Sequence, residues 1–435
     1  MKYHIITFGY QFNKSDAEKV TKVLTDYGYQ STDTLDKADV VLVLACSVRQ
    51  SAIDRIDGLK RKFAKIKKTR PLITILSGCV LKTDMGKMRK FFDVVLDIRD
   101  LSKLPEKISG TRLRQDFGGQ VSNQGSVSGY FDLHPAYKSN FQAYVPIMTG
   151  CDNFCAYCVV PYVRGREQSR KASDIIAECK SLISKGYKEI TLLGQNVNSY
   201  QGTMYKCQGT MTFSKLLQKI DSIPGRYWLR FMTSHPKDFS DELIDIMSNS
   251  KHITPYLHLP IQAGDDQVLK SMNRKYKVGH YKKLVNKVRK AIPNMSLSTD
   301  VIVGFPGETK KQFNNTAKVF KDLKFDMAYI SQYSQRAGTA AAKLEDNVPK
   351  VEKKKRDKIL TEILKKTSLE YNKKFIGNVV EVLVEENKNG YNIGRTDTYK
   401  TVKLKSNKDL KGKFVRVKIK KGPSAFGLTG ELVSD

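Results

Sequence analysis

The sequence of 435 residues predicts an α/β protein with three parts: an amino-terminal doubly wound parallel sheet, a central partial (β/α)6 barrel and a carboxy-terminal small β-barrel. Over the first two parts, apolar segments of strand length alternate with amphipathic segments of helix length, which is typical of parallel sheets covered by helices. The last part contains short strand-like segments separated by turn residues, a pattern that indicates a small barrel. We place the parts at 1–115, 137–367 and 371–435, and a linker at 116–136, within which residues 118–129 are rich in Gly, Ser, Gln and Asn.

The amino-terminal part is expected to contain four strands and two helices. The strands cover 4–8, 40–44, 72–76 and 94–97, and the helices cover 15–27, with Ser15 as N-cap, and 53–67. Functional groups in such sheets gather at the carboxyl ends of the strands. Cys46 and Cys79 each come just past a strand, so we expect them to converge in space. Tyr10 occupies the matching edge of the first strand.

The central part repeats a unit of strand, loop and helix. The expected strands cover 143–148, 189–193, 228–232, 256–259, 297–303 and 327–332. Each is followed by a polar or glycine-rich loop, and in barrel enzymes this end of the strands carries the chemistry. The loops supply the candidate cofactor-binding residues Gln195, Asn196, Asn198, Ser234, His235, Gln262 and Asp300. His235 is interpreted as a proton carrier or a loop-positioning residue, and Asp300 as a ligand of a ribose hydroxyl or a cap.

Three cysteines, Cys151, Cys155 and Cys158, lie in the loop after the first central strand. A [4Fe–4S] cluster is usually held by four thiolates, so three cysteines leave one iron open to another ligand. The spacing CxxxCxxC, with the aromatic Tyr157 before the last cysteine, resembles the signature of radical S-adenosylmethionine (SAM) enzymes. A structural zinc site or a disulfide is the alternative. Zinc normally recruits two separated pairs of ligands, and no further Cys or His follows within about twenty residues.

The composition points to a basic, cytoplasmic protein. The formal net charge is +32, which favours nucleic acid as a partner, although a lysine-rich solvated surface is the plainer reading. Seven cysteines are an odd number, which argues for metal chemistry in a reducing compartment over disulfides. No apolar run approaches the length of a membrane span.

The terminal part is expected to form five short strands, at 378–385, 390–395, 401–404, 414–420 and 427–432. Residues 371–435 contain 14 Lys and Arg against 7 Asp and Glu. Small basic β-barrels commonly bind oligonucleotides, so we expect this part to bind RNA, with a purely structural cap as the alternative.

In this order, the three parts resemble the tRNA methylthiotransferase family over nearly the whole chain. The amino-terminal motif reads Thr-Phe-Gly-Tyr-Gln-Phe-Asn at 7–13, where the family shows a cysteine in place of Tyr10. The loop at 333–341 is most similar to the branch that acts on isopentenyladenosine at position 37, beside the anticodon. The other matching stretches are 45–49, 77–80, 150–165, 192–198, 233–236, 257–262, 300–309 and a TRAM-like end at 427–432.

The resemblance implies a reaction and its cofactors. A [4Fe–4S] cluster on Cys151, Cys155 and Cys158 would cleave SAM to a 5′-deoxyadenosyl radical, and Tyr157 would pack near its adenine. The radical would take a hydrogen from carbon 2 of the adenine ring. In the family, three amino-terminal cysteines hold a second cluster that carries the sulfur. Here only Cys46 and Cys79 stand at that site, so a second cluster would have altered ligation.

The resemblance also implies partners: the anticodon stem–loop of tRNA and an electron donor such as flavodoxin or ferredoxin. We expect a monomer with no membrane attachment. Two related activities stay open, on threonylcarbamoyladenosine or on an aspartate of a ribosomal protein. An alternative from another functional class is an RNA-binding protein that has lost sulfur transfer because Tyr10 replaces a cluster cysteine.

Overall fold

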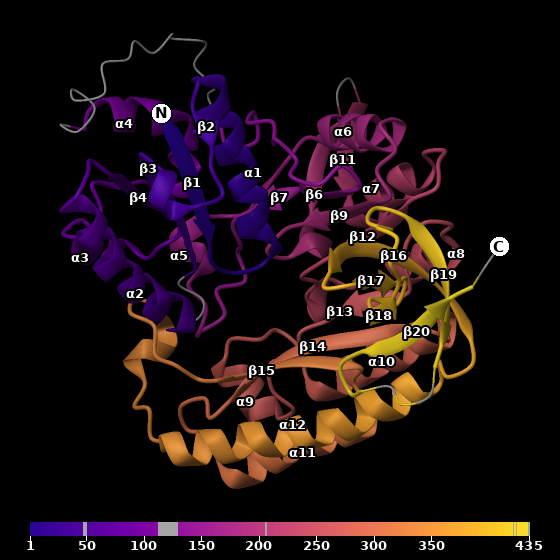
Figure 1. Cartoon of the computed structure of the whole chain (residues 1–435). Helices are drawn as coiled ribbons and strands as arrows, with labels where there is room; N and C mark the ends of the chain where they lie inside the picture. Colours follow the sequence, from indigo (N-terminus) through magenta and orange to yellow (C-terminus); the bar gives the residue numbers. More distant parts are fainter. Residues whose placement is uncertain (47–49, 112–128, 205–206, 421, 423, 434–435) are drawn as a thin grey trace.

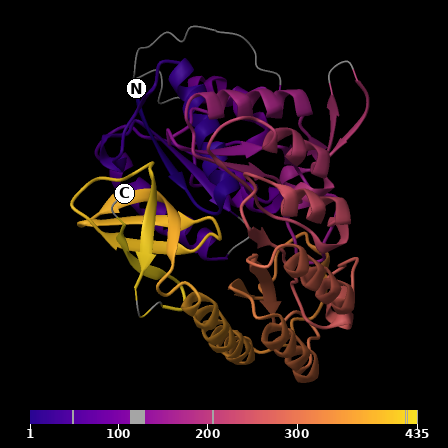
Figure 2. The same cartoon turned by 90° about the vertical axis from the view of Figure 1, so that its right-hand side faces the viewer.

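The computed structural model describes residues 1–46, 50–111, 129–204, 207–420, 422 and 424–433, and it shows three parts (Figure 1). An amino-terminal α/β part, in indigo, contacts a larger central α/β part, and a small β-barrel, in yellow, ends the chain. Figure 2 shows this barrel at the end of the long helix that leaves the central part. Most of the predicted linker lies outside the described residues.

The amino-terminal part is a five-stranded parallel sheet with strand order β2-β1-β3-β4-β5. This order, 2-1-3-4-5, is one of the two common doubly wound orders, and it places the topological switch point between β1 and β3. The elements are β1 Lys2–Thr7, α1 Gln11–Asp26, β2 Gln30–Ser31, η1 Leu35–Lys37, β3 Val40–Cys46, α2 Gln50–Lys67, β4 Ile73–Cys79, α3 Lys82–Met88, β5 Val94–Val95, η2 Ile98–Lys103 and α4 Leu104–Ser109.

Both faces of this sheet are covered. Along β3, Val40 and Leu42 pack into one hydrophobic cluster, whereas Val41 and Val43 pack into another on the opposite face. Successive side chains of a strand point to opposite faces, so a strand buried on both sides has to be apolar throughout. The predicted parallel sheet with helices on two faces is therefore present.

The structure adds β2, α3 and α4 to the predicted elements, and two details of the prediction that bear on the site are wrong. Helix α1 begins at Gln11 with Tyr10 as its N-cap, and Ser15 is buried inside the helix. The polar residues of its first turns conceal this start, because Asn13 is buried and bonds the carbonyls of Phe8 and Ala45. Strands β3 and β4 also extend through Cys46 and Cys79, which are the last strand residues and do not follow the strands.

The central part contains the six expected strands, interleaved with helices. Its elements up to the third strand are β6 Gln142–Pro146, β7 Met148–Thr149, α5 Val160–Arg164, β8 Gln168–Ser169, α6 Ala172–Ser184, β9 Glu189–Leu193, η4 Val197–Ser199, β10 Gln201–Met204, β11 Cys207–Thr212, α7 Phe213–Asp221 and β12 Trp228–Phe231. The remainder are η5 Pro236–Asp238, α8 Asp241–Asn249, β13 Tyr256–His258, α9 Asp266–Ser271, α10 Val278–Ala291, β14 Ser296–Val303, α11 Lys310–Leu323, β15 Met327–Gln332, η6 Ala340–Lys343 and α12 Lys350–Lys373.

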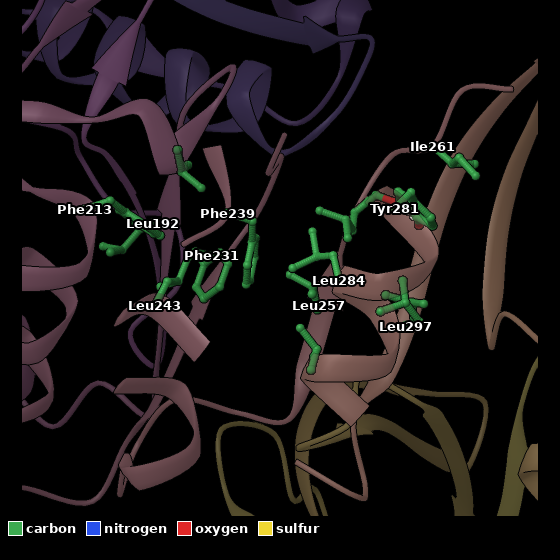
Figure 3. Packing of buried hydrophobic residues seen from close by; sticks show 14 of the residues in the cluster. Leu192, Phe213, Phe231, Phe239, Leu243, Leu257, Ile261, Tyr281, Leu284 and Leu297 are labelled. Atoms are coloured by element: carbon green, nitrogen blue, oxygen red, sulfur yellow. Dashed lines mark hydrogen bonds between the residues drawn. The ribbon is translucent and has the colours of Figure 1, made fainter. Parts of the chain in front are cut away.

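The six strands are hydrogen bonded as two parallel sheets of three, β12-β9-β6 and β13-β14-β15. A single parallel bridge between Leu229 and Ile253 connects β12 to the segment before β13. One hydrophobic cluster continues across both sheets, and Figure 3 shows Phe231 of β12 and Leu257 of β13 within it. The carboxyl ends of all six strands therefore belong to one packed body.

The terminal part is a closed five-stranded barrel with order β16-β17-β18-β20-β19, as the sequence predicts. Its strands are β16 Val379–Lys388, β17 Tyr391–Thr396, β18 Thr401–Lys405, β19 Phe414–Ile419 and β20 Leu428–Leu432. Among the described residues, no helix is both long and apolar enough to cross a membrane.

A buried arginine fixes the terminal barrel to the central part. Arg230 of β12 pairs with Glu189 at 2.6 Å and also donates to the backbone carbonyls of Thr396 and Asp397. Arg230, Glu189 and Thr396 are buried and Asp397 is half-buried, so breaking the Arg230–Glu189 pair would leave charge unpaired in the interior. The contact holds the small barrel at a fixed position beside β12.

Candidate active site

The cysteine loop connects β7 to α5 and lies at the carboxyl end of the first central strand. Cys151 is buried, whereas Cys155 and Cys158 are half-buried. Each sulfur accepts a hydrogen bond of 3.5 Å: Cys151 from Asn153 Nδ2, Cys155 from Arg274 Nη1 and Cys158 from the backbone N–H of Val160. The loop thus presents three separately held thiols.

The three thiols are close enough to influence one another. Burial and the charge of Cys155 raise the pKa of Cys158 to about 12, and burial raises that of Cys151. Within the described residues, however, no three His, Cys, Asp or Glu side chains converge on one point where a single ion could bind. Three thiols in one loop can each bind a different iron of a cluster.

Two residues that the sequence analysis missed hold the cysteine loop from the segment after α9. Asn273 has a left-handed backbone with φ of 57° and donates to the carbonyl of Phe154 at 2.9 Å. Arg274 reaches the Cys155 sulfur and also donates to the carbonyl of Pro260. Neither residue stands at a recognisable spacing from the cysteines, because about 120 residues separate them.

A cavity of about 680 Å³ opens where the three parts of the chain meet. Its volume lies within the range usual for ligand sites, about 300–1,000 Å³. It brings together three of the predicted site residues, Tyr157, Gln262 and Asp300, with one of the three cysteines. Residues of all three parts line it, among them Tyr10, Tyr157, Cys158, Gln262, Asp300 and Phe426.

Gln262 is held in a strained conformation at the wall of this cavity. Its φ is +68°, a left-handed value that non-glycine residues rarely adopt. Its backbone N–H donates to the carbonyl of Asp300 at 2.9 Å, and its carbonyl accepts from Ile302. Strain of this kind persists where the surroundings impose it, which is common at functional sites. The side chain of Asp300 lies 3.4 Å from His258.

A second cavity, of about 670 Å³, lies on the other side of the cysteine loop and is lined by Asn153, Asn196 and Asn198. Asn196 donates to Asp238 at 2.8 Å. Gln195, Ser234 and His235 line neither cavity in the described part of the chain. The predicted site residues are therefore divided between two cavities and the loops between them.

His235 is positioned as part of a loop. The side-chain amide of Asn198 accepts from its backbone N–H at 2.8 Å and donates to its carbonyl at 2.9 Å. Burial, together with Arg274 and Lys237, lowers the pKa of His235 to about 2. Its Nδ1 accepts from the backbone N–H of Lys237 at 3.2 Å. A neutral, bonded imidazole supports the loop-positioning role over the proton carrier.

Comparison with known proteins assigns all three parts. The chain matches the Radical SAM superfamily over residues 145–320, the family described as uncharacterized protein family UPF0004 over 2–97 and the TRAM domain over 373–433. It is 42% identical over 442 residues to the tRNA-2-methylthio-N(6)-dimethylallyladenosine synthase of Clostridium novyi (strain NT), covering 99% of this chain and 96% of that protein. The synthase of the same name from Thermoanaerobacter sp. (strain X514) is 42% identical over 440 residues, covering 99% and 92%. This chain belongs to the tRNA-2-methylthio-N(6)-dimethylallyladenosine synthase family.

Solved structures agree with this family in fold. The radical SAM methyltransferase TsrM from Kitasatospora setae superposes with a TM-score of 0.55 at 13% identity, covering 78% of this chain and 75% of TsrM. The cobalamin-dependent radical SAM enzyme OxsB gives 0.52 at 9% identity, covering 85% of this chain and 56% of OxsB. At such identities the likeness concerns the α/β radical SAM fold alone.

The cofactors of a radical SAM synthase are a [4Fe–4S] cluster and SAM, and the residues of this site fit both. The three cysteine thiols are free and share one loop, as the ligands of such a cluster do. Three buried acceptor atoms have no partner in the described structure: Gln195 Oε1, Asn196 Oδ1 and Ser234 Oγ. Buried polar atoms are nearly always hydrogen bonded, so these acceptors suit the ammonium and hydroxyl donors of SAM.

The second cysteine site of this synthase-family chain lies at the sheet edge of the amino-terminal part. Cys46 and Cys79 are register partners at the last positions of β3 and β4, so their backbones lie side by side. Gly9 packs against Cys46, because a Cβ on it would lie 3.0 Å from the Cys46 Cβ. From α5, Arg164 donates through Nε to the Cys79 sulfur at 3.1 Å.

The donor set of this second site does not fit a cluster held by three thiolates. It supplies two thiols and one guanidinium, and Tyr10 stands where the family shows the third cysteine. The Tyr10 ring lies 6.5 Å from that of Tyr329, at the wall of the large cavity. We therefore derive no reaction step through a second cluster.

Proposed function

We propose that this protein adds a methylthio group to carbon 2 of N(6)-dimethylallyladenosine beside the anticodon of tRNA. The observation that carries the proposal is the 42% identity to synthases of that name over 99% of the chain. The site supports it, because one cysteine of the radical SAM loop lines a cavity that all three parts of the chain help to form.

A [4Fe–4S] cluster with SAM supplies a 5′-deoxyadenosyl radical, which can remove a hydrogen that no ordinary base activates. Cys151, Cys155 and Cys158 would hold the cluster. Asn196 would bind SAM from the second cavity, and Gln195 and Ser234, which line neither cavity, would offer their unpartnered oxygens from the adjoining loops. Tyr157, Gln262 and Asp300 would face the adenosyl group and the target base across the large cavity.

The central part acts in this proposal as a partial (β/α)6 barrel whose strand ends face the substrate. Two features support that arrangement. The six parallel strands follow one another along the chain, and the Leu229–Ile253 bridge connects the two sheets. Polar loops at the carboxyl ends of parallel strands are the usual place for catalytic groups.

The small barrel would bind the RNA backbone. Along β18, Lys403 and Lys405 face solvent, and Arg416 and Lys418 do so along β19. These strands flank β20 in the barrel, so the four cations share one outer surface. An enzyme of this kind would act as a cytoplasmic monomer on the anticodon stem–loop and take electrons from a flavodoxin or ferredoxin.

Nucleoside mass spectrometry of tRNA tests the function. Cells that lack this gene should lose the 2-methylthio derivative and accumulate N(6)-dimethylallyladenosine, and the wild-type gene should restore the product. A gene with Cys151→Ala, which removes a proposed ligand of the radical SAM cluster, should not restore it. Unchanged tRNA nucleosides would reject the proposal. A change confined to threonylcarbamoyladenosine or to a ribosomal-protein aspartate would assign one of the two related activities instead.

A further inference from the structure

Three exposed aromatic side chains come together at the large cavity, one from each part of the chain. Tyr10, Tyr329 and Phe426 are 40%, 38% and 50% exposed, and all three line the cavity. Large apolar rings are usually buried, so a group of exposed rings at one cavity marks a binding surface. Cys158 of the radical SAM loop lines the same cavity, so the exposed rings share it with a proposed cluster ligand.

The backbone of Tyr10 is fixed while its ring faces the cavity. As the N-cap of α1, Tyr10 accepts backbone hydrogen bonds from Asn13 and Lys14 through its carbonyl. The rings of Tyr10 and Tyr329 meet edge to face at 6.5 Å, and His258 meets Tyr329 in the same way at 5.9 Å. Tyr10 and Tyr329 thus form a preorganised wall from two parts of the chain, and His258 supports the ring of Tyr329.

The neighbouring cysteine pair is covered by the residue before Tyr10. Gly9 has φ of +111° and approaches Cys46 so closely that a Cβ would lie 3.3 Å from its sulfur. Arg164 donates a hydrogen bond to the sulfur of Cys79. Gly9 thus packs against the Cys46 thiol, and the ring of Tyr10 contributes to the cavity wall.

From these contacts we infer that Tyr10 stacks against the target nucleobase together with Tyr329, and that it is a substrate-binding residue and no ligand of a second cluster. The inference rests on the proposed function, which supplies an unstacked purine as the occupant. Proteins that modify a base must take it out of its stack, and aromatic faces receive bases freed in this way. An N(6)-alkylated adenine offers a π-face and an apolar arm, which both suit aromatic walls.

A thermodynamic cycle between Tyr10 and the base tests the inference. The probes are two synthetic anticodon stem–loops, one with N(6)-dimethylallyladenosine and one abasic at the same position, and their affinity is measured by anisotropy on anaerobically prepared full-length protein. Since stacking on one aromatic ring contributes about 1–3 kcal/mol per base, Tyr10→Ala should weaken binding of the first probe about 5- to 150-fold. It should change binding of the abasic probe less than twofold.

Two further variants separate stacking from other roles. Tyr10→Phe should keep both the affinity and the iron content of the wild type, because it keeps the ring and loses only the hydroxyl. Phe91→Ala, which removes an exposed ring of the same part outside the cavity lining, should change neither.

Three results would overturn the inference. Loss of iron in Tyr10→Phe would show that the phenol is a metal ligand. Equal weakening of both probes by Tyr10→Ala would show a structural role, and unchanged affinity would show no contact with the base. Failure of the proposed function is distinct from all three, because the wild-type protein would then not prefer the dimethylallyl probe to the abasic one.

Discussion

Arg164 Nε lies 3.1 Å from the Cys79 sulfur, although the two residues belong to different parts of the chain. The same guanidinium pairs with Asp16 at 2.5 Å, and both side chains are almost completely buried. Arg164 ends the short helix that directly follows the radical SAM loop. One residue therefore connects the three-cysteine loop to the second cysteine site and joins the two parts through a buried ion pair.

Removing Arg164 should destabilise the protein strongly. Among the described residues, Arg164→Met leaves the buried Asp16 carboxylate with Tyr130 as its side-chain hydrogen-bond donor. Removing one partner of a buried ion pair costs about 3–5 kcal/mol of unfolding free energy. Urea unfolding of the metal-free protein measures this loss. Replacing both partners, as Arg164→Met with Asp16→Leu, should recover part of it because no unpaired charge stays buried.

The exposed pair Arg99–Asp97 provides the matched control. It has a similar distance, 2.6 Å, but the Arg99 side chain is 45% exposed. Arg99→Met should lower the free energy of unfolding by less than about 1 kcal/mol. If Arg99→Met and Arg164→Met lowered the free energy of unfolding equally, the buried Arg164–Asp16 pair would not be the reason for the loss.

The radical SAM loop should be required for cleavage of SAM. Cys155→Ala removes one of three proposed ligands and should reduce 5′-deoxyadenosine formation under dithionite to background, together with the iron of this site. Cys179→Ala is the control, since Cys179 is a buried core residue of α6. Cleavage that persists in Cys155→Ala would reject the ligand assignment.

The sequence predicts the strands and the cysteine loop well because both are local patterns. Continuous apolar runs mark β3 and β4, and the spacing of Cys151, Cys155 and Cys158 is visible within eight residues. The start of α1 is missed because its first turns are polar. In the structure they are buried against another part, which no local pattern reveals.

The residues that support the site are contacts between distant segments. Arg164 meets Asp16 across 148 residues, and Arg274 meets Cys155 across 119. Each is a single arginine in a chain with 76 basic residues, so composition does not distinguish them from surface charges. Only the three-dimensional structure shows which basic side chains are buried and which residues they contact.

The outer cations of the small barrel should determine the salt dependence of tRNA binding. Changing Lys403, Lys405, Arg416 and Lys418 to Gln should lower the slope of log affinity against log salt by about 3, because each lost phosphate contact removes about 0.7–0.9. Replacement of the exposed α12 residues Lys354, Lys355 and Lys358 by Gln removes a similar charge elsewhere. Equal slopes for both variants would mean that the barrel is a structural cap.

Glu18 should make folding less favourable as pH rises towards neutrality. Burial raises its pKa from 4.5 to about 7, despite a hydrogen bond from the Lys138 backbone and the charge of Lys14. Between these values the folded chain holds a proton that the unfolded chain has released, so the free energy of unfolding falls as pH rises. The loss from pH 4.5 to 7 is roughly 2–3 kcal/mol for this group.

Glu18→Gln isolates this effect in urea unfolding between pH 5 and 7. The difference in unfolding free energy between variant and wild type should grow with pH over this interval in favour of the variant. Glu106→Gln, at an exposed position of α4, should follow the wild type. A difference that is constant with pH would show that Glu18 does not titrate in this range.

Tyr10→Cys should restore the missing thiol of the second cysteine site. Wild-type protein offers two thiols there, at Cys46 and Cys79, and should retain about four irons per chain, those of the radical SAM cluster. A cysteine at position 10 makes three thiols at the switch point between β1 and β3 and should raise the content towards about eight. Tyr10→Cys also removes the stacking ring, so product is compared at saturating tRNA, where it should rise with the iron. 5′-Deoxyadenosine formation should stay the same because its cluster has separate ligands. Eight irons in the wild type, with as much product as Tyr10→Cys, would show that another residue completes the second site.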